Sequence, residues 1–387
     1  MKNLVLFLLV FFSVNTFAQL TIKSDLILFP QGYGLNLLNS SGNSSIVNDV
    51  SNISFMNPAA ITGLKNYSAA ISYQFNTDLK EAWIADIGMK RIYNFFPQSF
   101  GAVAKYGNFS FGLGLGQRYN GTKEFGKIPI TTPDRPDGTG EFIELREKNT
   151  IQSYSLSTAY SLSEVLQSSF DIQIGLKYSL NYLRHSMYIL YNNINAKGYY
   201  SSFSFGITSL FDLDEERFLQ LGLSYEISSE LNVNPQIDID LLSIPDPNNR
   251  TNYYLHPIEL FYKSPSELNF NIAVDATNDL MFLGGLRAVF WSSQKEYFKN
   301  QLEFSLSGLY KFSEIVKASL GFYSTDFKNE NFSSLELGEE FNAFFLTTGL
   351  NLNISIISID LALADSHLFS GKFTKQTILK LAAGVQL

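Results

Sequence analysis

The sequence predicts an all-β protein: a transmembrane antiparallel β-barrel of about 14 strands with an N-terminal plug in its lumen. Three observations support this fold class. Apolar residues alternate with polar or small ones along most of the chain, 15% of the residues are aromatic, and only 17% are charged. Alternation with a period of two is typical of strands. A charged fraction well below the globular norm of about 25%, with 45% hydrophobic residues, argues against a disordered chain.

Charge and cysteine content exclude further classes. The formal net charge is -8, so no basic stripe is available to neutralise phosphates, and we expect no nucleic-acid partner. The sequence has no cysteine, which excludes a disulfide scaffold and lipid attachment through a cysteine. No run of 18 apolar residues follows the N-terminus, which argues against a helical membrane protein of the usual kind.

Residues 1–18 are predicted to be a secretory signal peptide. Lys2 gives a basic start, residues 4–12 form an unbroken apolar run, and a small and polar stretch ends at Ala18. The alternative is a membrane anchor, but so short an apolar run does not cross roughly 30 Å of hydrocarbon as a helix. We therefore expect cleavage near Ala18 and export of the remaining chain.

Residues 67–387 are predicted to form the barrel. In the last segment, Leu379, Leu381 and Val385 share one face, while Lys380 and Gln386 share the other. The same alternation places strands at 67–77, 98–106, 109–121, 149–163, 167–184, 199–211, 214–231, 264–276, 278–292, 300–312, 314–327, 341–353, 355–366 and 374–387.

The connections distinguish a membrane barrel from a soluble β-sandwich, which also alternates. Every second connection is tight, as at 106–109 and 353–355. The connections between them are long, notably 122–148, 185–198, 232–263 and 328–340. Short turns on one rim and long loops on the other are typical of an outer-membrane barrel. In lipid every backbone group must be paired within the protein, so amphipathic strands that span a membrane must close into a barrel.

Several polar and small residues fall on the inward faces of these strands. Gly112, Gly114 and Gly116 are spaced by two and leave room in the lumen; without a following helix they are not evidence for a nucleotide site. Inward charges are expected to pair with one another or with the plug; they are Lys177, Glu226, Glu303, Lys311, Lys317, Asp360 and Lys380. Lys317 is our candidate for a lumen cation that receives a ligand carboxylate.

The long loops contain apolar clusters in segments expected to face water. They are Ile128, Ile130, Phe142, Ile143, Leu241, Leu242 and Ile244. Exposed apolar patches often mark binding sites, so we interpret these residues as a capture site for a hydrophobic ligand. The alternative is that the loops pack on each other.

Catalysis has little support in the sequence. The three histidines, His185, His256 and His367, fall in predicted outer loops, and neither HExxH nor GxSxG occurs. We predict no enzyme activity, no cofactor and no metal site.

Residues 19–66 do not alternate, yet they carry many apolar side chains. Asn57-Pro58-Ala59 predicts a rigid turn, because proline fixes φ and asparagine bonds nearby backbone; an ordinary turn is the alternative. Gly32 and Gly34 would allow positive φ or a close approach to the barrel wall, and a flexible loop is the alternative. The stretch from Gln31 to Leu35, followed by Asn57-Pro58-Ala59, resembles the N-terminal plug of the FadL/TodX family.

Three later blocks extend the resemblance over nearly the whole mature chain. Residues 157–163 with 174–176, residues 264–268 with 290–292, and residues 309–312 with 318–323 look like hairpins of that family in the same order. The family comprises outer-membrane transporters of long-chain fatty acids and other hydrophobic compounds.

The resemblance implies a plug (19–66) in which Asn57-Pro58-Ala59 closes the segment just before the first strand. It implies the outer membrane of a Gram-negative-type bacterium as location, with membrane lipid and lipopolysaccharide as surroundings. It also implies passive transport of a fatty acid-like or other hydrophobic small molecule. Some FadL-like barrels serve instead in protein secretion, so a secretion-system partner is the alternative function.

Overall fold

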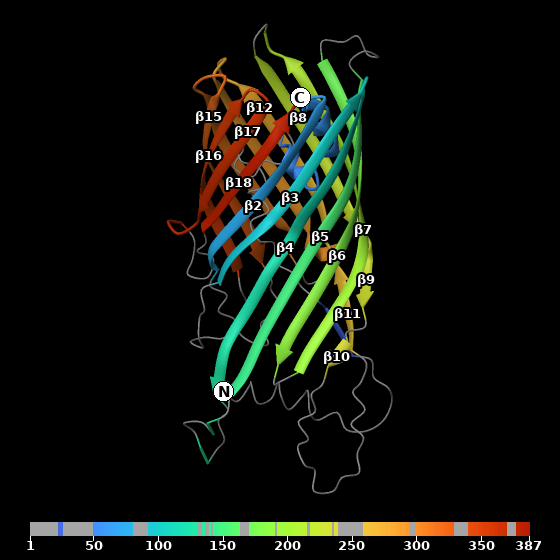
Figure 1. Ribbon diagram of the computed structural model, residues 1–387, viewed down its shortest axis with the longest axis vertical. Helices are drawn as coiled ribbons and strands as arrows, with labels where there is room; N and C mark the ends of the chain where they lie inside the picture. The colour runs from blue at the N-terminus through green and yellow to red at the C-terminus, as the bar shows by residue number, and fades with distance from the viewer. Residues whose placement is uncertain are drawn as a thin grey trace.

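The computed structural model describes residues 22–25, 49–79, 92–129, 134–135, 139–140, 142–162, 170–189, 192–214, 217–233, 236–238, 258–293, 299–328, 340–369 and 377–387. Within them, fourteen strands pair side by side into a closed antiparallel barrel (Figure 1). The strands are β2 (Tyr67–Leu79), β3 (Ile92–Tyr106), β4 (Phe109–Pro129), β5 (Phe142–Ser161), β6 (Phe170–Ile189), β7 (Asn192–Asp212), β8 (Phe218–Ser228), β12 (Ser266–Asp275), β13 (Leu280–Phe290), β14 (Gln301–Lys311), β15 (Val316–Lys328), β16 (Glu340–Ile354), β17 (Ile357–Asp365) and β18 (Thr377–Gln386). The predicted barrel is confirmed, and each strand overlaps its predicted range.

Burial in this barrel is the inverse of that in a soluble protein. Outward side chains are large, apolar and exposed, as at Leu113 (56%), Phe203 (56%) and Leu320 (63%). Most inward side chains are polar or small and buried, and even Asn181 and Lys380 are at most 1% exposed. A soluble fold keeps its polar side chains in water and its large apolar side chains inside.

The barrel has two different ends. The tight connections between β3 and β4, β14 and β15, and β16 and β17 lie at one end, which we call the turn end. The opposite end, the loop end, is uneven, because β4 to β7 extend well beyond the other strands (Figure 1). In β4 to β7 the predicted loops 122–148 and 185–198 are therefore partly wrong. Pairs such as Thr122 with Lys148 continue the ladder through polar residues, where alternation of apolar and polar side chains gives no signal.

A second sheet has three strands. Two of them lie between β8 and β12 in the chain, and the third lies near the N-terminus. The sheet comprises β1 (Ile22–Asp25), β11 (Ile258–Lys263) and β9 (Glu230–Val233), with β1 parallel and β9 antiparallel to β11. The short β10 (Gln236–Asp238) pairs with the outer part of β7. The predicted loop 232–263 is therefore wrong in part, because it contains β10, β11 and the end of β9.

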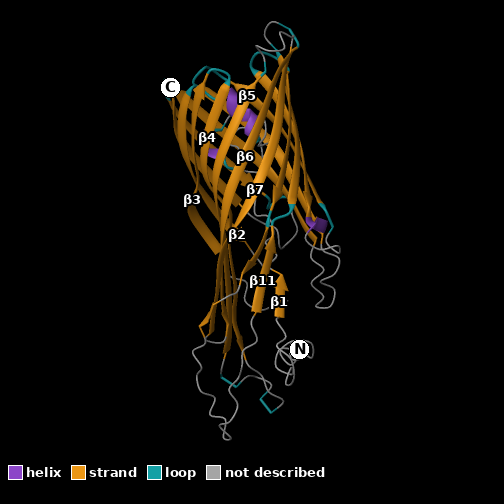
Figure 2. Cartoon of the chain, turned by 90° about the vertical axis from the view of Figure 1, so that its right-hand side faces the viewer, coloured by secondary structure: helices purple, strands orange, loops and turns teal. Residues whose placement is uncertain are grey.

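The described residues also contain three 3-10 helices: η2 (Val50–Asn52), η3 (Pro58–Gly63) and η4 (Trp291–Ser293). The first two belong to a segment, residues 49–64, that we call the inner segment. It lies inside the barrel, enclosed by the strands (Figure 2). None of the helices in the described residues is long and apolar enough to cross a membrane.

Candidate functional site

The inner segment is built from two capped 3-10 turns. The Asp49 carboxylate accepts a hydrogen bond from the Ser51 backbone N–H at 2.9 Å, and the Asn57 Oδ1 accepts one from the Ala59 N–H at 3.0 Å. Both are caps of the kind that Asp and Asn favour. Pro58 then occupies the first helical position, where its missing N–H costs nothing. Asn57-Pro58-Ala59, predicted to be a rigid turn, therefore begins a short capped helix.

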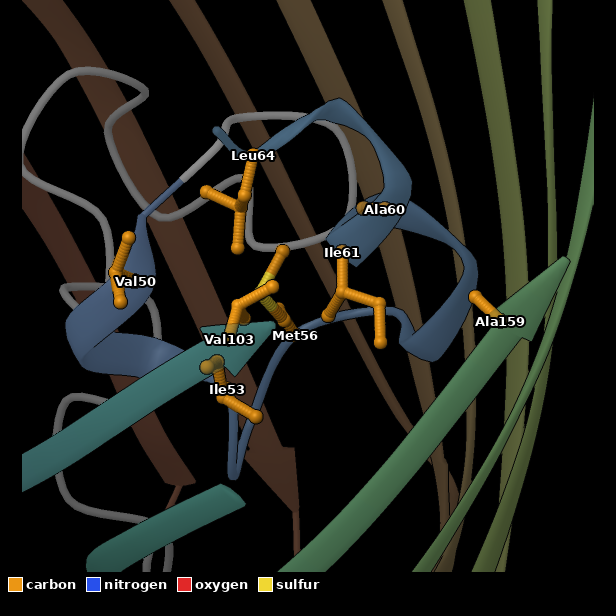
Figure 3. Close-up of a cluster of buried hydrophobic side chains, with 8 residues drawn as sticks. All are labelled: Val50, Ile53, Met56, Ala60, Ile61, Leu64, Val103 and Ala159. Carbon is orange, nitrogen blue, oxygen red and sulfur yellow. The ribbon is translucent and has the colours of Figure 1, made fainter. Parts of the chain in front are cut away.

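Apolar side chains of the inner segment form a cluster with the barrel wall. Val50, Ile53, Met56 and Ile61 are at most 3% exposed, and the cluster also contains Ala60, Leu64, Val103 of β3 and Ala159 of β5 (Figure 3). Burying each of the four larger side chains contributes roughly 1.5–3 kcal/mol. This cluster holds the inner segment toward the turn end of the barrel.

Asn57 also joins the inner segment to the barrel. Its Nδ2 donates to the backbone carbonyls of Ile207 on β7 and Leu223 on β8, each at 3.1 Å. These two residues face each other across the β7–β8 ladder. One buried amide side chain thus contacts two neighbouring strands and caps its own helix.

The wall of β3 to β7 has glycines where the inner segment contacts it. A Cβ at Gly101 would lie 1.7 Å from the Val50 carbonyl oxygen, and one at Gly206 would lie 1.8 Å from Asn57 Oδ1. At Gly175 a Cβ would meet the Pro58 and Ala59 backbone at 2.4 Å. The close approach of the inner segment to the wall requires glycine at these positions.

The glycines that we predicted to leave room in the lumen have a similar environment. A Cβ at Gly112, Gly114 or Gly116 would lie 3.2, 2.5 or 2.4 Å from Ile53, Ser54 or Phe55, respectively. The room is filled by the inner segment.

Two buried lysines hold the inner segment from different strands. Lys177 of β6 donates from Nζ to the carbonyl oxygens of Ser54 (3.0 Å) and Met56 (3.2 Å). Lys380 of β18 donates to Asn52 Oδ1 at 3.0 Å. Hydrogen bonds from a charged donor are stronger than neutral ones.

A cluster of charged side chains lies beside the inner segment on one side of the barrel, on strands from β4 to β14. Glu226 forms an ion pair with Arg118 and lies 3.8 Å from Lys177. Arg287 bridges Glu267 at 2.9 Å and Glu303 at 2.8 Å. These groups line a small cavity of about 60 Å³ together with Phe55, Met56 and Pro58 of the inner segment. We expected inward charges to pair, but did not identify Arg118, Glu267 and Arg287, although the period-two pattern places all three on inward faces.

Apolar inner surfaces lie on opposite walls of the barrel. On β4 to β7, Tyr119, Ile151, Leu183 and Tyr200 are buried against Leu231 of β9 and Tyr262 of β11. On the other wall, formed by β15 to β18, Tyr323, Phe345 and Ile378 form a second apolar cluster with Ala364. The sheet of β9 and β11 thus packs against the inner face of β4 to β7.

The structure places the other predicted residues apart from this region. Lys317 is half-buried on β15, in one cross-strand row with Asn351 and Asp360. Ile128 and Ile143 face each other at the ends of β4 and β5, and Phe142 begins β5, so these residues of the predicted capture site lie on strands instead of loops. The remaining predicted residues, Gly32, Gly34, Ile130, Leu241, Leu242 and Ile244, lie outside the described residues, as does the signal peptide.

The histidines give no catalytic constellation in the described part of the chain. His185 lies on β6, not in a loop as predicted, and its Nδ1 is 2.7 Å from Asn149 Oδ1. His367 contacts Asp365 at 3.0 Å after β17, and His256 lies outside the described residues. Among the described residues no three His, Asp or Glu side chains are placed to hold a metal ion.

Proteins of known structure share this architecture. The toluene transporter TbuX of Ralstonia pickettii aligns with a TM-score of 0.61 and 12% identity, over 90% of this chain and 97% of TbuX. The toluene transporter TodX of P. putida gives a TM-score of 0.61 and 11% identity, over 90% and 97%. A FadL homologue of Pseudomonas aeruginosa gives 0.59 and 12%, over 89% and 96%.

No family model matches the sequence, and no curated protein matches it. The structural likeness nevertheless covers most of the chain and nearly the whole of each of these proteins. The chain has the FadL/TodX-type transporter fold.

Proposed function

We propose that this protein is a passive transporter of hydrophobic compounds in the outer membrane of a Gram-negative-type bacterium, with long-chain fatty acids among its cargo. The observation that carries the proposal is a barrel that is apolar outside, polar inside and occupied by the inner segment. An exterior of exposed Leu, Ile and Phe side chains suits hydrocarbon, and a closed barrel leaves no strand edge unpaired in it. TbuX and TodX, which share the fold, are toluene transporters.

The inner segment supports a plug role for residues 19–66. Residues 49–64 fill the barrel toward the turn end, and their contacts with the wall are side-chain hydrogen bonds and apolar packing. A hydrophobic cargo would enter at the loop end, between the two apolar clusters on opposite walls. Displacement of the inner segment would then open the route past the cluster of charged side chains.

The loop end supports capture of the cargo. Tyr119 and Tyr200 of the wall and Tyr262 of β11 give an apolar inner surface with aromatic rings, and Tyr200 and Tyr262 pack edge to face at 5.4 Å. Aromatic rings provide a large apolar contact area. Movement of the β9–β11 sheet away from the wall would expose this surface to cargo.

The experiment is mass spectrometry of the molecules that copurify with the barrel in a mild detergent, together with uptake of a radiolabelled fatty acid and of toluene into proteoliposomes. We expect a stoichiometric hydrophobic compound that is lost when Asn57 and Pro58 are both replaced, and uptake down a gradient without added energy. An empty barrel that retains a stoichiometric secreted or periplasmic protein would refute the transporter and favour the secretion role.

A further inference from the structure

The outer face of the barrel is hollowed where β3 to β8 lie side by side. A cavity of about 770 Å³ lies on this face. Its floor includes one complete cross-strand row, one residue from each strand: Ala104, Phe111, Thr158, Leu176, Phe205 and Tyr225. The next outward row, two residues farther from the turn end on each strand, includes Leu113, Leu156 and Phe203. We call this hollow the outer trough.

The outer trough lies directly behind the inner segment. The inward row between its two apolar rows runs through Gly112, Ser157 and Ser204 and contains Lys177, which holds the inner segment. The neighbouring inward row contains Gly175 and Gly206, against which Asn57 and Pro58 pack. The same part of the wall therefore contacts the inner segment on one face and forms a hollow on the other.

The position of the outer trough selects one leaflet of a membrane. Ala104 and Ala102 lie two and four residues before Tyr106, the last residue of β3 at the turn end. At about 3.3 Å per residue both lie within roughly 15 Å of that end. This distance is about half of the 30 Å hydrocarbon thickness. If the turns face the periplasm, as in the proposed function, the β3 end of the outer trough lies in the phospholipid leaflet and not in the lipopolysaccharide leaflet.

The length of the row matches the depth of one membrane leaflet. Six strands at a spacing of about 4.8 Å give a row roughly 24 Å long. Barrel strands tilt by about 35–45°, so a row perpendicular to them is inclined to the membrane plane by the same angle. The row therefore rises roughly 15 Å through the membrane, the depth of one leaflet.

We propose that the outer trough binds one acyl chain of a phospholipid from the periplasmic leaflet. The chain would lie across β3 to β8 and pack against the wall that holds the inner segment from inside. The small outward residues Ala102 and Ala104 leave the space that the chain fills. This inference rests on the membrane location of the proposed function but not on transport.

The test compares full-length wild type with Ala104→Phe, which fills the outer trough. The matched control is Ala318→Phe: Ala318 pairs with the exposed outward residues Tyr310 and Leu350, lies two residues from the turn-end start of β15, and is outside the outer trough. Each protein is purified from membranes in a mild detergent, and bound phospholipid is counted by mass spectrometry. Heat-modifiable gel mobility verifies folding, and Ala102→Phe replaces Ala104→Phe if the latter does not fold.

We expect about one tightly bound phospholipid per wild-type barrel, the same in Ala318→Phe, and at least a fivefold loss in the trough variant. Equal phospholipid in the trough variant and the control, or none in wild type, would overturn the inference. A phosphate-free hydrocarbon in the trough would overturn it also, because the occupant would then be cargo. Uptake into proteoliposomes is measured in parallel, so that a barrel that transports but binds no phospholipid refutes only this inference.

Discussion

Replacement of Asn57 tests whether one side chain holds the inner segment in place. The side chain is 1% exposed and makes three hydrogen bonds: two from Nδ2 to the carbonyls of Ile207 and Leu223, and one from the Ala59 N–H to Oδ1. In Asn57→Ala, loss of the two wall hydrogen bonds costs about 1–3 kcal/mol. Loss of the helix cap costs about 1 kcal/mol more.

The sum, about 2–4 kcal/mol, corresponds to a roughly 30- to 700-fold larger population of barrels with a displaced inner segment. Asn57→Asp should be at least as disruptive, because a carboxylate oxygen would face two carbonyl oxygens where Nδ2 now donates. The assay is single-channel conductance in planar bilayers, where a displaced inner segment appears as brief openings. The ratio of open to closed time of each variant gives the population ratio.

Ser54→Ala provides the matched control within the same buried segment. The Ser54 hydroxyl is buried, and its oxygen has no hydrogen-bond partner among the described residues. Its removal should leave the opening frequency within about twofold of wild type, because no hydrogen bond is lost. If Asn57→Ala and Ser54→Ala behave alike, the anchoring role of the Asn57 amide is refuted.

Three further predictions concern other contacts of the inner segment and the loop end. Lys177→Met should lower the free energy of unfolding by about 3–5 kcal/mol, because it breaks a buried ion pair and two hydrogen bonds to the inner segment. Lys317→Met should cost less, because Lys317 is half-buried. Heat-modifiable gel mobility compares the resistance of the two variants to unfolding. Gly175→Ala should raise bilayer conductance without unfolding the barrel, because its Cβ would lie 2.4 Å from inner-segment backbone, while Gly308→Ala, with its nearest atom at 3.7 Å, should be silent. Leu231→Ala should loosen the β9–β11 sheet by about 2–5 kcal/mol, which limited proteolysis would detect as faster cleavage near the loop end while the barrel strands stay resistant.

The barrel could be predicted from the sequence because lipid-facing strands repeat one simple pattern. The last strand was expected at 374–387 and is observed at 377–386, since its alternation continues to the end of the chain. The strands β4 to β7 were predicted too short. The strand expected at 109–121, for example, is observed as β4 at 109–129. In the extensions of these strands apolar and polar residues no longer alternate regularly, as at 122–129, so the pattern disappears while the backbone ladder continues.

The candidate site was less accessible to sequence reasoning. The turn at Asn57 is a local feature and could be predicted from proline and asparagine chemistry. Its partners Ile207 and Leu223 follow it by 150 and 166 residues, and contacts between the inner segment and the wall follow no sequence period. The spacing of Gly112, Gly114 and Gly116 indicated inward space, but it did not indicate which segment fills it.

The way the inner segment is attached suits it to movement. Each of the fourteen barrel strands is paired on both sides by other strands, so the wall is complete without residues 49–64. The inner segment contributes no strand to the barrel; it is held by the Asn57 amide, by one apolar cluster and by three lysines, Lys105, Lys177 and Lys380. Its displacement would therefore break no backbone ladder of the barrel, and its cost is limited to these contacts. A plug that opens while the barrel stays intact requires this separation between the hydrogen bonds that close the wall and the contacts that fill the lumen.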